Sequence, residues 1–559
     1  MESTFSHQNS IPSLPLPGLK DTIEKYLKSL SPIVSKEELE HVTSLARGFG
    51  DSENGRKLQN FLELKSSSSK NWLEDWWYDA YTTNQDTLLT QNMGAIIPKS
   101  FMSNTSQIGM ASQIIHHLMN YWSRVRHEKI EITKSRGINW DMSQVYNLFN
   151  ACRTPAVSKD KIERYFCTES EGFCPSHIVV LYNGHIWKME TVQNGKILSV
   201  PEIRNILEII KSGSNRTDEN SIVKLTSLER DTWAKLMKYS IFGSPLNAYM
   251  DKNLNIIVLK DGKACLQAEH GNVDAISLFA PCDFAADQFL DDSELSEKTL
   301  ENSSSTPTIE KIDFLLTGSV SSRIAEAEKQ FFALSSRINV NVYHYSNFGA
   351  TFCKSRKLYA DTIIQIALQM AYLKTHNKLA PIYETASTRK FYHGRTETVR
   401  SLTPDLAKYL EACENSATNE TIKTLFFDAY NSHNTLMDAA RDGKGIDRHF
   451  LGLRMSQLAL KSYGEKIAIP FLDDHSYAAS GGNGNFLLST SFLGYNENGC
   501  FGYVVPMCKD GYGAFYRINA SRFTFTLSNY FDDATNGDEF RENLEYSLDF
   551  IKNVIVTNE

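Results

Sequence analysis

A histidine and an aspartate stand close together in the stretch AEHGNVDA, where His270 and Asp274 lie among small side chains. Near neutral pH an imidazole can accept a proton from a hydroxyl group, and a carboxylate bonded to its other ring nitrogen fixes the tautomer that does so. A turn between the two residues would let Asp274 hold His270 in this way. The alternative is a solvated loop histidine beside an unrelated aspartate, and the spacing alone does not decide between the two.

Three hydroxyl side chains follow one another in the apolar stretch NFLLSTSFLGY. If this stretch is a β-strand, alternation sends Ser489 and Ser491 to one face and Thr490 to the other. Two hydroxyls that point into a cavity could hold a polar substrate or donate to an oxyanion. Ordinary hydrogen bonds between neighbouring strands would use the same residue types, so the stretch is a candidate and not a signature.

Arginines are frequent in PIYETASTRKFYHGRTETVRS and in GKGIDRHFLGLR, which contains Arg448. A guanidinium flanked by apolar residues needs an anion, which would be a structural carboxylate such as Asp447 or a bound ligand. In KSRKLYAD, Lys354, Arg356 and Lys357 precede an apolar helix that begins near Asp361. Positive charge beside a helix N-terminus suits a phosphate group, although a solvated basic turn explains it equally well.

The bulk properties exclude several classes of protein. A length of 559 residues predicts two domains or one very large one. The net charge of −8, without a Lys/Arg-rich tract, argues against a nucleic-acid partner. The nine cysteines form no C-x-x-C pair, so no disulfide framework and no metal site are predicted. No apolar stretch is long enough to predict a membrane-spanning helix, and the N-terminal stretch has neither a secretory nor a mitochondrial leader pattern.

The elements that must position these residues alternate between helices and short strands. The patterns predict an amphipathic helix near 20–30, a hairpin around Asn183 and Gly184, and a buried helix from Asp361. The polar stretch 291–310 predicts a linker or long loop. Four successive strands and a closing amphipathic helix are predicted after 484. The fold class is therefore α/β, with the strand-rich region at the carboxy end.

Ten stretches, taken in order, resemble the choline/carnitine acyltransferase family and cover nearly the whole chain. They are SLPLPGL, NWLEDWW, RYFCTESEG, SHIVVL, DTIIQIALQMAY, YETASTRKFYHGRTETVRS, GKGIDRHFLGL, GGNGNFLLSTS, VVPM and GYGAFY. The resemblance implies two chloramphenicol-acetyltransferase-like domains, each a mixed β-sheet flanked by helices, with a tunnel between them. Residues 86–315 would form the amino-side domain that carries His270, and residues 1–85 with 316–559 the carboxy-side domain.

The resemblance also implies the reaction, which is reversible transfer of a medium-chain acyl group between coenzyme A and L-carnitine. His270 would be the general base, Asp274 the residue that orients it, and Ser491 the residue that stabilises the oxyanion. Coenzyme A and carnitine are substrates, and no cofactor is expected. We expect a soluble intracellular monomer, located in peroxisomes as the family's close members are. The tail VTNE is not a peroxisomal S-K-L-type signal, so the cytoplasm and the mitochondrial matrix remain alternatives. A catalytically weakened binding protein of the same family, a carnitine acetyltransferase of shorter-chain preference and a scaffold protein remain alternatives.

Further residues match substrate-contacting positions of the family. For the carnitine carboxylate these are Tyr383, Thr396 and Arg448; nearby carnitine contacts are Thr385 and Ser489, and Phe501 would face the trimethylammonium group. For coenzyme A they are Lys354, Ser355, Arg356, Lys357 and Asp361.

Three features depart from the family pattern or bear on chain length. Ala350 stands where a second lysine for a phosphate of coenzyme A is expected, which predicts weaker binding of coenzyme A. The segment between Trp233 and His270 is shorter than in the family, so a wall of the tunnel or only a loop is trimmed. Small residues around Gly499 predict room for a medium acyl chain.

Overall fold

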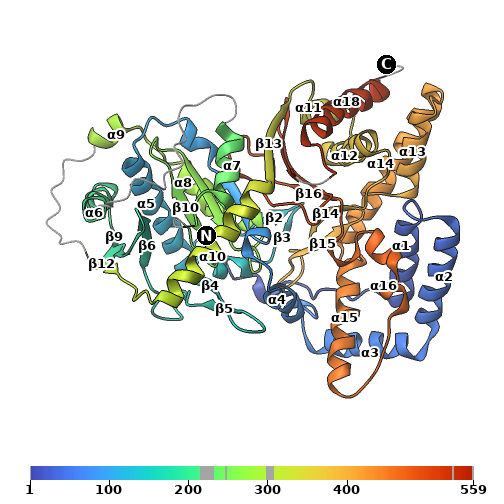
Figure 1. Cartoon of the computed structure of the whole chain (residues 1–559), viewed down its shortest axis with the longest axis horizontal. Coiled ribbons are helices and arrows are strands. Elements are labelled where there is room, and N and C mark those ends of the chain that lie inside the picture. Colours follow the sequence, from blue (N-terminus) through green and yellow to red (C-terminus); the bar gives the residue numbers. More distant parts are fainter. Residues whose placement is uncertain (1, 215–231, 246–247, 298–307, 532–533, 557–559) are drawn as a thin grey trace.

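The computed structural model describes residues 2–214, 232–245, 248–297, 308–531 and 534–556 (Figure 1). Its two largest sheets lie side by side, each with its own hydrophobic core. Helices flank both sheets, so the α/β fold class predicted from the sequence is confirmed. The predicted division into two domains stays a prediction, since one strand crosses between the halves.

The larger sheet is mixed and has the strand order β13-β19-β18-β16-β14-β15. Its strands are β13 (Ile338–Tyr345), β14 (Ile382–Ser387), β15 (Thr396–Val399), β16 (Leu488–Phe492), β18 (Tyr512–Ile518) and β19 (Phe523–Tyr530). Strands β14, β16 and β18 pair in parallel, and the other pairs are antiparallel. All residues of β18 and β19 are buried, which is usual for central strands covered on both faces.

Three long helices pack beside this sheet. They are α12 (Ala360–His376), α14 (Asn419–Arg441) and α18 (Gly537–Val556). Helix α12 is buried almost all round, as its apolar sequence predicts. Helix α18 turns Phe540, Leu544, Leu548, Ile551 and Ile555 into the core, which confirms the predicted closing helix. Two short helices accompany them, α11 (Ala350–Ser355) and α13 (Pro404–Glu414).

The second sheet is antiparallel and has the order β10-β11-β1-β17. Its strands are β1 (Met93–Ile96), β10 (Asn255–Val258), β11 (Ala264–Ala268) and β17 (Phe501–Tyr503). Three helices pack around it, α5 (Gln107–Arg126), α7 (Thr232–Phe242) and α8 (Ala275–Ala286). Strand β17 comes from the carboxy half of the chain, and its Gly502 lies opposite Ala95 of β1. The trimmed segment before His270 supplies the edge strand β10.

A smaller sheet of order β12-β7-β6 lies at the far side of the amino half. Its strands are β6 (His177–Tyr182), β7 (His185–Glu190) and β12 (Ile309–Ile312), and α6 (Val200–Ser212) packs on it. Asn183 and Gly184 join β6 to β7 with φ angles of 48° and 76°, as the predicted tight hairpin requires. Of the predicted linker, residues 298–307 lie outside the described residues.

Helices at the amino terminus pack against helices from the carboxy half. The first set is α1 (Leu19–Leu30), α2 (Lys36–Asp51), α3 (Glu53–Ser68) and α4 (Glu74–Thr82); the second is α15 (Asp447–Ser462), α16 (Pro470–Asp473) and α17 (His475–Ala479). Helix α1 confirms the predicted amphipathic helix.

The remaining elements are short or peripheral. They are the pairs β2 (Lys134–Ser135) with β3 (Ile138–Asn139), β4 (Ala151–Thr154) with β5 (Lys161–Arg164) and β8 (Val192–Gln193) with β9 (Lys196–Ile197), and the helices α9 (Asp292–Glu297) and α10 (Gly318–Arg337).

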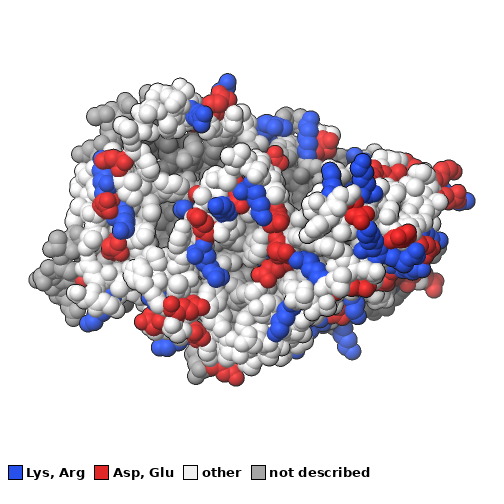
Figure 2. Space-filling model, turned by 90° about the horizontal axis from the view of Figure 1, so that it is seen from below, with Lys and Arg blue, Asp and Glu red and all other residues white. Residues whose placement is uncertain are grey.

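The surface carries acidic and basic side chains interspersed with uncharged ones on the face seen in Figure 2. Within the described part of the chain, no helix combines the length and the apolar character needed to cross a membrane.

Candidate active site

A cavity of about 880 Å³ is lined by both halves of the chain. Its amino-half lining includes His270, Asp274 and Met93, and its carboxy-half lining comes from β14, β16, β17 and α14. Of the predicted site residues, eight line this cavity: His270, Asp274, Asp361, Tyr383, Thr385, Thr396, Ser489 and Ser491. The structure therefore brings together predicted residues that lie up to 221 positions apart in sequence, from His270 to Ser491.

His270 follows β11 in the loop that leads into α8, and its Nδ1 lies 2.8 Å from the backbone oxygen of Val273. A carbonyl oxygen can only accept a hydrogen bond, so Nδ1 carries the proton and Nε2 is the nitrogen that can act as a base. The prediction that the Asp274 carboxylate makes this bond is wrong. The loop from His270 to Asp274 is tight enough to place the backbone oxygen of Val273 next to Nδ1, and this oxygen takes the position expected for the Asp274 carboxylate.

The carboxylate of Asp274 instead accepts two hydrogen bonds from other parts of the chain. Arg395 Nε donates to Oδ1 at 2.9 Å, and the amide nitrogen of Gln144 donates to Oδ2 at 2.7 Å. Burial alone would raise the pKa of Asp274, but the positive charge of Arg395, the neighbouring His270 and the hydrogen bonds from Gln144 and Arg395 outweigh it and lower the pKa. Asp274 is thus a fixed negative charge near His270.

Arg395 ties the histidine loop to the larger sheet. Besides Asp274, its guanidinium donates to the backbone oxygens of Gly271 at 2.8 Å and His270 at 3.1 Å. The side chain is almost fully buried and packs over the ring of Trp77. The sequence analysis missed Arg395 and Gln144. The run of arginines in YETASTRKFYHGRTETVRS was a signal for the first, and no signal in the sequence marked the second.

The three hydroxyls of β16 are divided between two faces, as strand alternation predicts. The hydroxyl of Thr490 donates to the backbone oxygen of Tyr383 at 2.9 Å and accepts from Gln365 of α12, also at 2.9 Å. Strand alternation turns Ser489 and Ser491 to the other face, and all three residues border the cavity. Two hydroxyls are therefore presented next to the same space as His270.

Arg448 lies in the first turn of α15 and bonds to two of the residues predicted with it. Its Nε donates to the backbone oxygen of Thr396 at 2.9 Å, and a terminal nitrogen lies 3.3 Å from both the Thr396 and the Tyr383 hydroxyls. Its guanidinium stacks 4.3 Å from the ring centroid of Trp77. Burial disfavours the charged form, yet interactions with Tyr383, Glu397 and Asp447 raise the pKa of Arg448.

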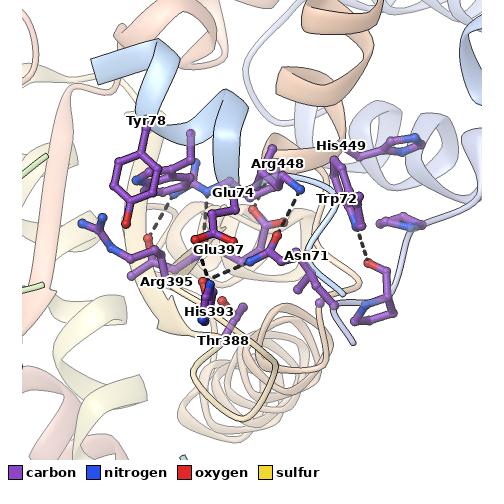
Figure 3. A pocket seen from close by; sticks show the side chains of 17 residues that line it. Asn71, Trp72, Glu74, Tyr78, Thr388, His393, Arg395, Glu397, Arg448 and His449 are labelled. Atoms are coloured by element: carbon purple, nitrogen blue, oxygen red, sulfur yellow. Dashed lines mark hydrogen bonds and ion pairs between the residues drawn. The ribbon is translucent and has the colours of Figure 1, made fainter. Parts of the chain in front are cut away.

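Figure 3 shows the space beside Arg448, a pocket of about 30 Å³ behind the large cavity. Arg395, Glu397 and Arg448 converge there, and Trp77 and Thr396 line both spaces. Asp447 is not the partner of Arg448. It forms a two-point ion pair with Arg400, with N–O distances of 2.8 and 3.0 Å.

A family model described as Choline/Carnitine o-acyltransferase matches residues 14–248 and 237–546. The chain belongs to the choline/carnitine acyltransferase family.

Two of the similar proteins are named as carnitine acyltransferases. The peroxisomal carnitine O-octanoyltransferase of Bos taurus is 33% identical over 580 residues, which cover 94% of this chain and 93% of that protein. The carnitine O-acetyltransferase of Homo sapiens is 29% identical over 598 residues, which cover 97% and 93%. Among solved structures, the TRI3 trichothecene 15-O-acetyltransferase from Fusarium sporotrichioides matches 85% of this chain and 94% of its own at 10% identity, with a TM-score of 0.40.

Glu397 is an additional ionisable group in this family site, next to Arg448. One carboxylate oxygen accepts from the backbone nitrogens of Thr398 at 2.7 Å and Arg448 at 3.3 Å. Burial raises the pKa of Glu397 to about 7, against the opposing attraction of Arg448. The charge beside Arg448 therefore changes near neutral pH.

Phe501 does not line the cavity, contrary to the prediction that it faces a trimethylammonium group. Its side chain is fully buried in the core of the antiparallel sheet, and the guanidinium of Arg517 lies 4.9 Å from its ring centroid. Gly502 and Tyr503, the next residues of β17, line the cavity instead. Gly499 is also absent from the lining, so its predicted part in chain-length preference has no support from the geometry.

Only one of the residues predicted to bind coenzyme A lines the cavity. Lys354, Ser355, Arg356 and Lys357 lie on the surface or partly exposed around the end of α11, and the cavity lining does not include them. Arg356 stacks on Phe352, 4.2 Å from its ring centroid. Ala350 is buried, so this position offers no charge to a ligand.

Asp361, in contrast, lines the cavity at the start of α12. Its carboxylate accepts a hydrogen bond of 2.6 Å from the hydroxyl of Tyr516. Burial and then the negative charge of Glu384 raise the pKa of Asp361 to about 6. Glu384 is itself paired with His433, 2.7 Å away, and this buried pair was missed by the sequence analysis.

Proposed function

We propose that the protein is a carnitine O-acyltransferase that transfers a medium-chain acyl group reversibly between coenzyme A and L-carnitine. The observation that carries the proposal is the cavity in which the base His270 and the hydroxyl of Ser491 share one space with the partners of Arg448. Membership of the family and the names of the similar proteins support the same substrates.

The reaction needs one base and no covalent intermediate on the protein. Nε2 of His270 takes the proton of the carnitine hydroxyl while the hydroxyl oxygen attacks the thioester carbonyl carbon. The Ser491 hydroxyl donates to the oxyanion of the tetrahedral intermediate. The carbon–sulfur bond then breaks, and His270 returns its proton to the departing thiolate. The bond from Nδ1 to the Val273 oxygen keeps the ring in the tautomer that both steps need.

The negative end of carnitine would occupy the donors around Arg448. A carboxylate there receives hydrogen bonds from the guanidinium and from the hydroxyls of Tyr383 and Thr396, which both lie within hydrogen-bond distance of one terminal nitrogen of Arg448. Choline has no carboxylate and gains nothing from this set. The arrangement therefore favours carnitine as acceptor, with Thr385 and Ser489 as further polar contacts in the lining.

The acyl chain would occupy the apolar part of the cavity. Its side chains include Met93, Leu493, Val504, Val505 and Phe515. A medium chain is proposed because the more similar relatives are octanoyltransferases. Their names also support a peroxisomal location for this protein.

The test mixes the purified protein with octanoyl-CoA and L-carnitine and follows the release of free thiol. We expect turnover that requires carnitine, is not supported by choline, and is slower with acetyl-CoA. His270→Ala should lower kcat by about 10²- to 10⁴-fold with unchanged binding of coenzyme A. Binding of both substrates without thiol release would leave a catalytically weakened binding protein, and an unchanged rate in His270→Ala would refute the assignment of the base.

A further inference from the structure

Two arginines, Arg136 and Arg441, line the cavity, although the basic turn predicted for coenzyme A lies outside the lining; we call the part of the lining around these two arginines and Asp438 the mouth. Arg136 from the β2–β3 hairpin and Arg441 at the end of α14 both line the cavity, together with Tyr359 and Tyr495. Burial and then the negative charge of Asp361 raise the pKa of Tyr495, and the positive charges of Arg441 and Arg136 oppose this rise.

The two guanidiniums share one carboxylate at long range. Asp438 lies 3.9 Å from Arg136 and 4.0 Å from Arg441, at the limit of an ion pair. The Arg136 and Asp438 side chains are both 66% exposed. Exposed pairs of this length bind weakly, so an incoming anion can replace Asp438 without leaving a buried charge unpaired. Lys390, the other cation of the lining near this mouth, has its own partner in Asp442.

The position of the mouth fits the phosphate-bearing end of coenzyme A. Asp361, which was only predicted to contact coenzyme A, lies in the same lining as Arg136 and Arg441. The proposed donors for the carnitine carboxylate are Arg448, Tyr383 and Thr396, which are bonded to one another through Arg448. A second anion site in one cavity suits a substrate whose reactive thioester and phosphate groups are joined by a long flexible arm.

We propose that Arg136 and Arg441 bind a phosphate group of coenzyme A and replace the positive charge that Ala350 does not supply. This inference rests on the proposed function and adds residues to its coenzyme A site. Because Arg136 belongs to the amino half and Arg441 to the carboxy half, the bound phosphate bridges the two halves across the mouth. The guanidinium geometry matches phosphate oxygens with two donors each.

The experiment compares the wild-type protein with the double variant Arg136→Gln/Arg441→Gln, using three octanoyl donors. These are octanoyl-CoA, octanoyl-dephospho-CoA and octanoyl-pantetheine, which carries no phosphate. We expect the KM for octanoyl-CoA to rise at least about tenfold, because two charge-assisted contacts at an exposed site are lost, with kcat and the KM for carnitine unchanged. With octanoyl-pantetheine the two proteins should have the same KM. Octanoyl-dephospho-CoA lacks the 3′-phosphate but keeps the diphosphate, so a difference in KM that persists with this donor assigns the contact to the diphosphate, and a difference that disappears assigns it to the 3′-phosphate.

Two further variants sharpen the result. Asp438→Asn removes the competing carboxylate and should lower the KM for octanoyl-CoA. Lys20→Gln/Arg47→Gln removes two exposed charges of α1 and α2, paired with Asp51 and Glu24, and should change nothing. An equal KM for octanoyl-CoA in the wild type and the Arg136/Arg441 variant would overturn the inference, as would an equal rise with octanoyl-pantetheine.

Calorimetric binding of coenzyme A to the same variants separates this inference from the proposed function. If the wild-type protein binds coenzyme A but transfers no acyl group, the proposed function fails and the loss of affinity in Arg136→Gln/Arg441→Gln still tests the phosphate site. An unaltered affinity in that variant would refute the site whatever the activity.

Discussion

Two pairs of arginines in and beside the cavity are held in opposite ways. Arg448 and Arg395, in the small pocket, are buried and bonded to fixed oxygens, and Trp77 packs against both. Arg136 and Arg441, at the mouth, are exposed and share a distant carboxylate. A small rigid acceptor gains most from donors held in place, whereas a long flexible donor substrate needs only charge to capture its far end.

The largest expected effect comes from removing the buried guanidinium of Arg395. Arg395→Gln leaves the buried Asp274 carboxylate without its ion pair, which typically costs about 3–5 kcal/mol of unfolding free energy. Because the same guanidinium holds the His270 loop, kcat should fall as well. Urea unfolding and thiol-release kinetics measure the two effects.

A matched exposed pair serves as the control for this change. Arg454→Gln removes a 2.7 Å ion pair with Asp473, whose carboxylate side chain is 52% exposed, and should cost less than about 1 kcal/mol. Equal losses of unfolding free energy in the two variants would show that the buried Arg395–Asp274 pair stabilises the fold no more than the Arg454–Asp473 pair does.

Arg448→Gln should act on one substrate only. Losing a charge-assisted contact to a carboxylate costs about 1.5–3 kcal/mol, which raises the KM for carnitine by about 10- to 100-fold. The KM for octanoyl-CoA should stay the same, because that substrate's phosphates lie at the mouth in our proposal. Initial rates over a grid of both substrates give both constants, and a parallel rise in the two would contradict the division into two sites.

The pH dependence of carnitine binding should depend on Glu397. Its pKa of about 7 is raised from the model-peptide value of 4.5, so the group is neutral below pH 7 and negative above it. Above that pH the carboxylate competes with carnitine for Arg448, and the KM for carnitine should rise several-fold between pH 6 and 8 (roughly one unit on either side of this pKa). Glu397→Gln should flatten this profile.

The raised pKa of Glu397 also makes the unfolding free energy depend on pH. The folded chain keeps the proton to a higher pH than the unfolded chain, so the contribution of Glu397 to the unfolding free energy falls as pH rises from about 4.5 to about 7. In Glu397→Gln this fall should be absent. A profile that is identical in the two proteins would place the titration elsewhere.

The smallest effect is expected at the basic turn after α11. Lys354→Gln/Lys357→Gln removes two exposed charges outside the cavity lining, and the KM for octanoyl-CoA should change by less than about threefold. A change here that exceeds the change in Arg136→Gln/Arg441→Gln would show that the turn, and not the arginine pair, contacts the phosphate.

What the sequence could predict follows from how local each determinant is. The hairpin at Asn183 and Gly184, the buried α12 and the alternation of Ser489, Thr490 and Ser491 depend on near neighbours, and the structure confirms them. The grouping of Tyr383, Thr396 and Arg448 came from family resemblance, since no local pattern joins residues that far apart.

The errors arose where the deciding partner is distant or is backbone. Asp274 was expected to bond His270, but Arg395 attracts its carboxylate and the Val273 oxygen serves the ring. Phe501 was expected at the cavity, but in the short β17 it packs into the core on the side of Arg517. No one-dimensional pattern encodes such choices between competing partners.

The pairing of β17 with β1 has a mechanical consequence. Three residues of the carboxy half are stitched by backbone hydrogen bonds into the sheet of the amino half, with Tyr503 opposite Gly94. The two halves cannot rotate apart about a hinge without breaking the hydrogen bonds between β17 and β1. We therefore expect substrates and products to exchange without a hinge motion that separates β17 from β1.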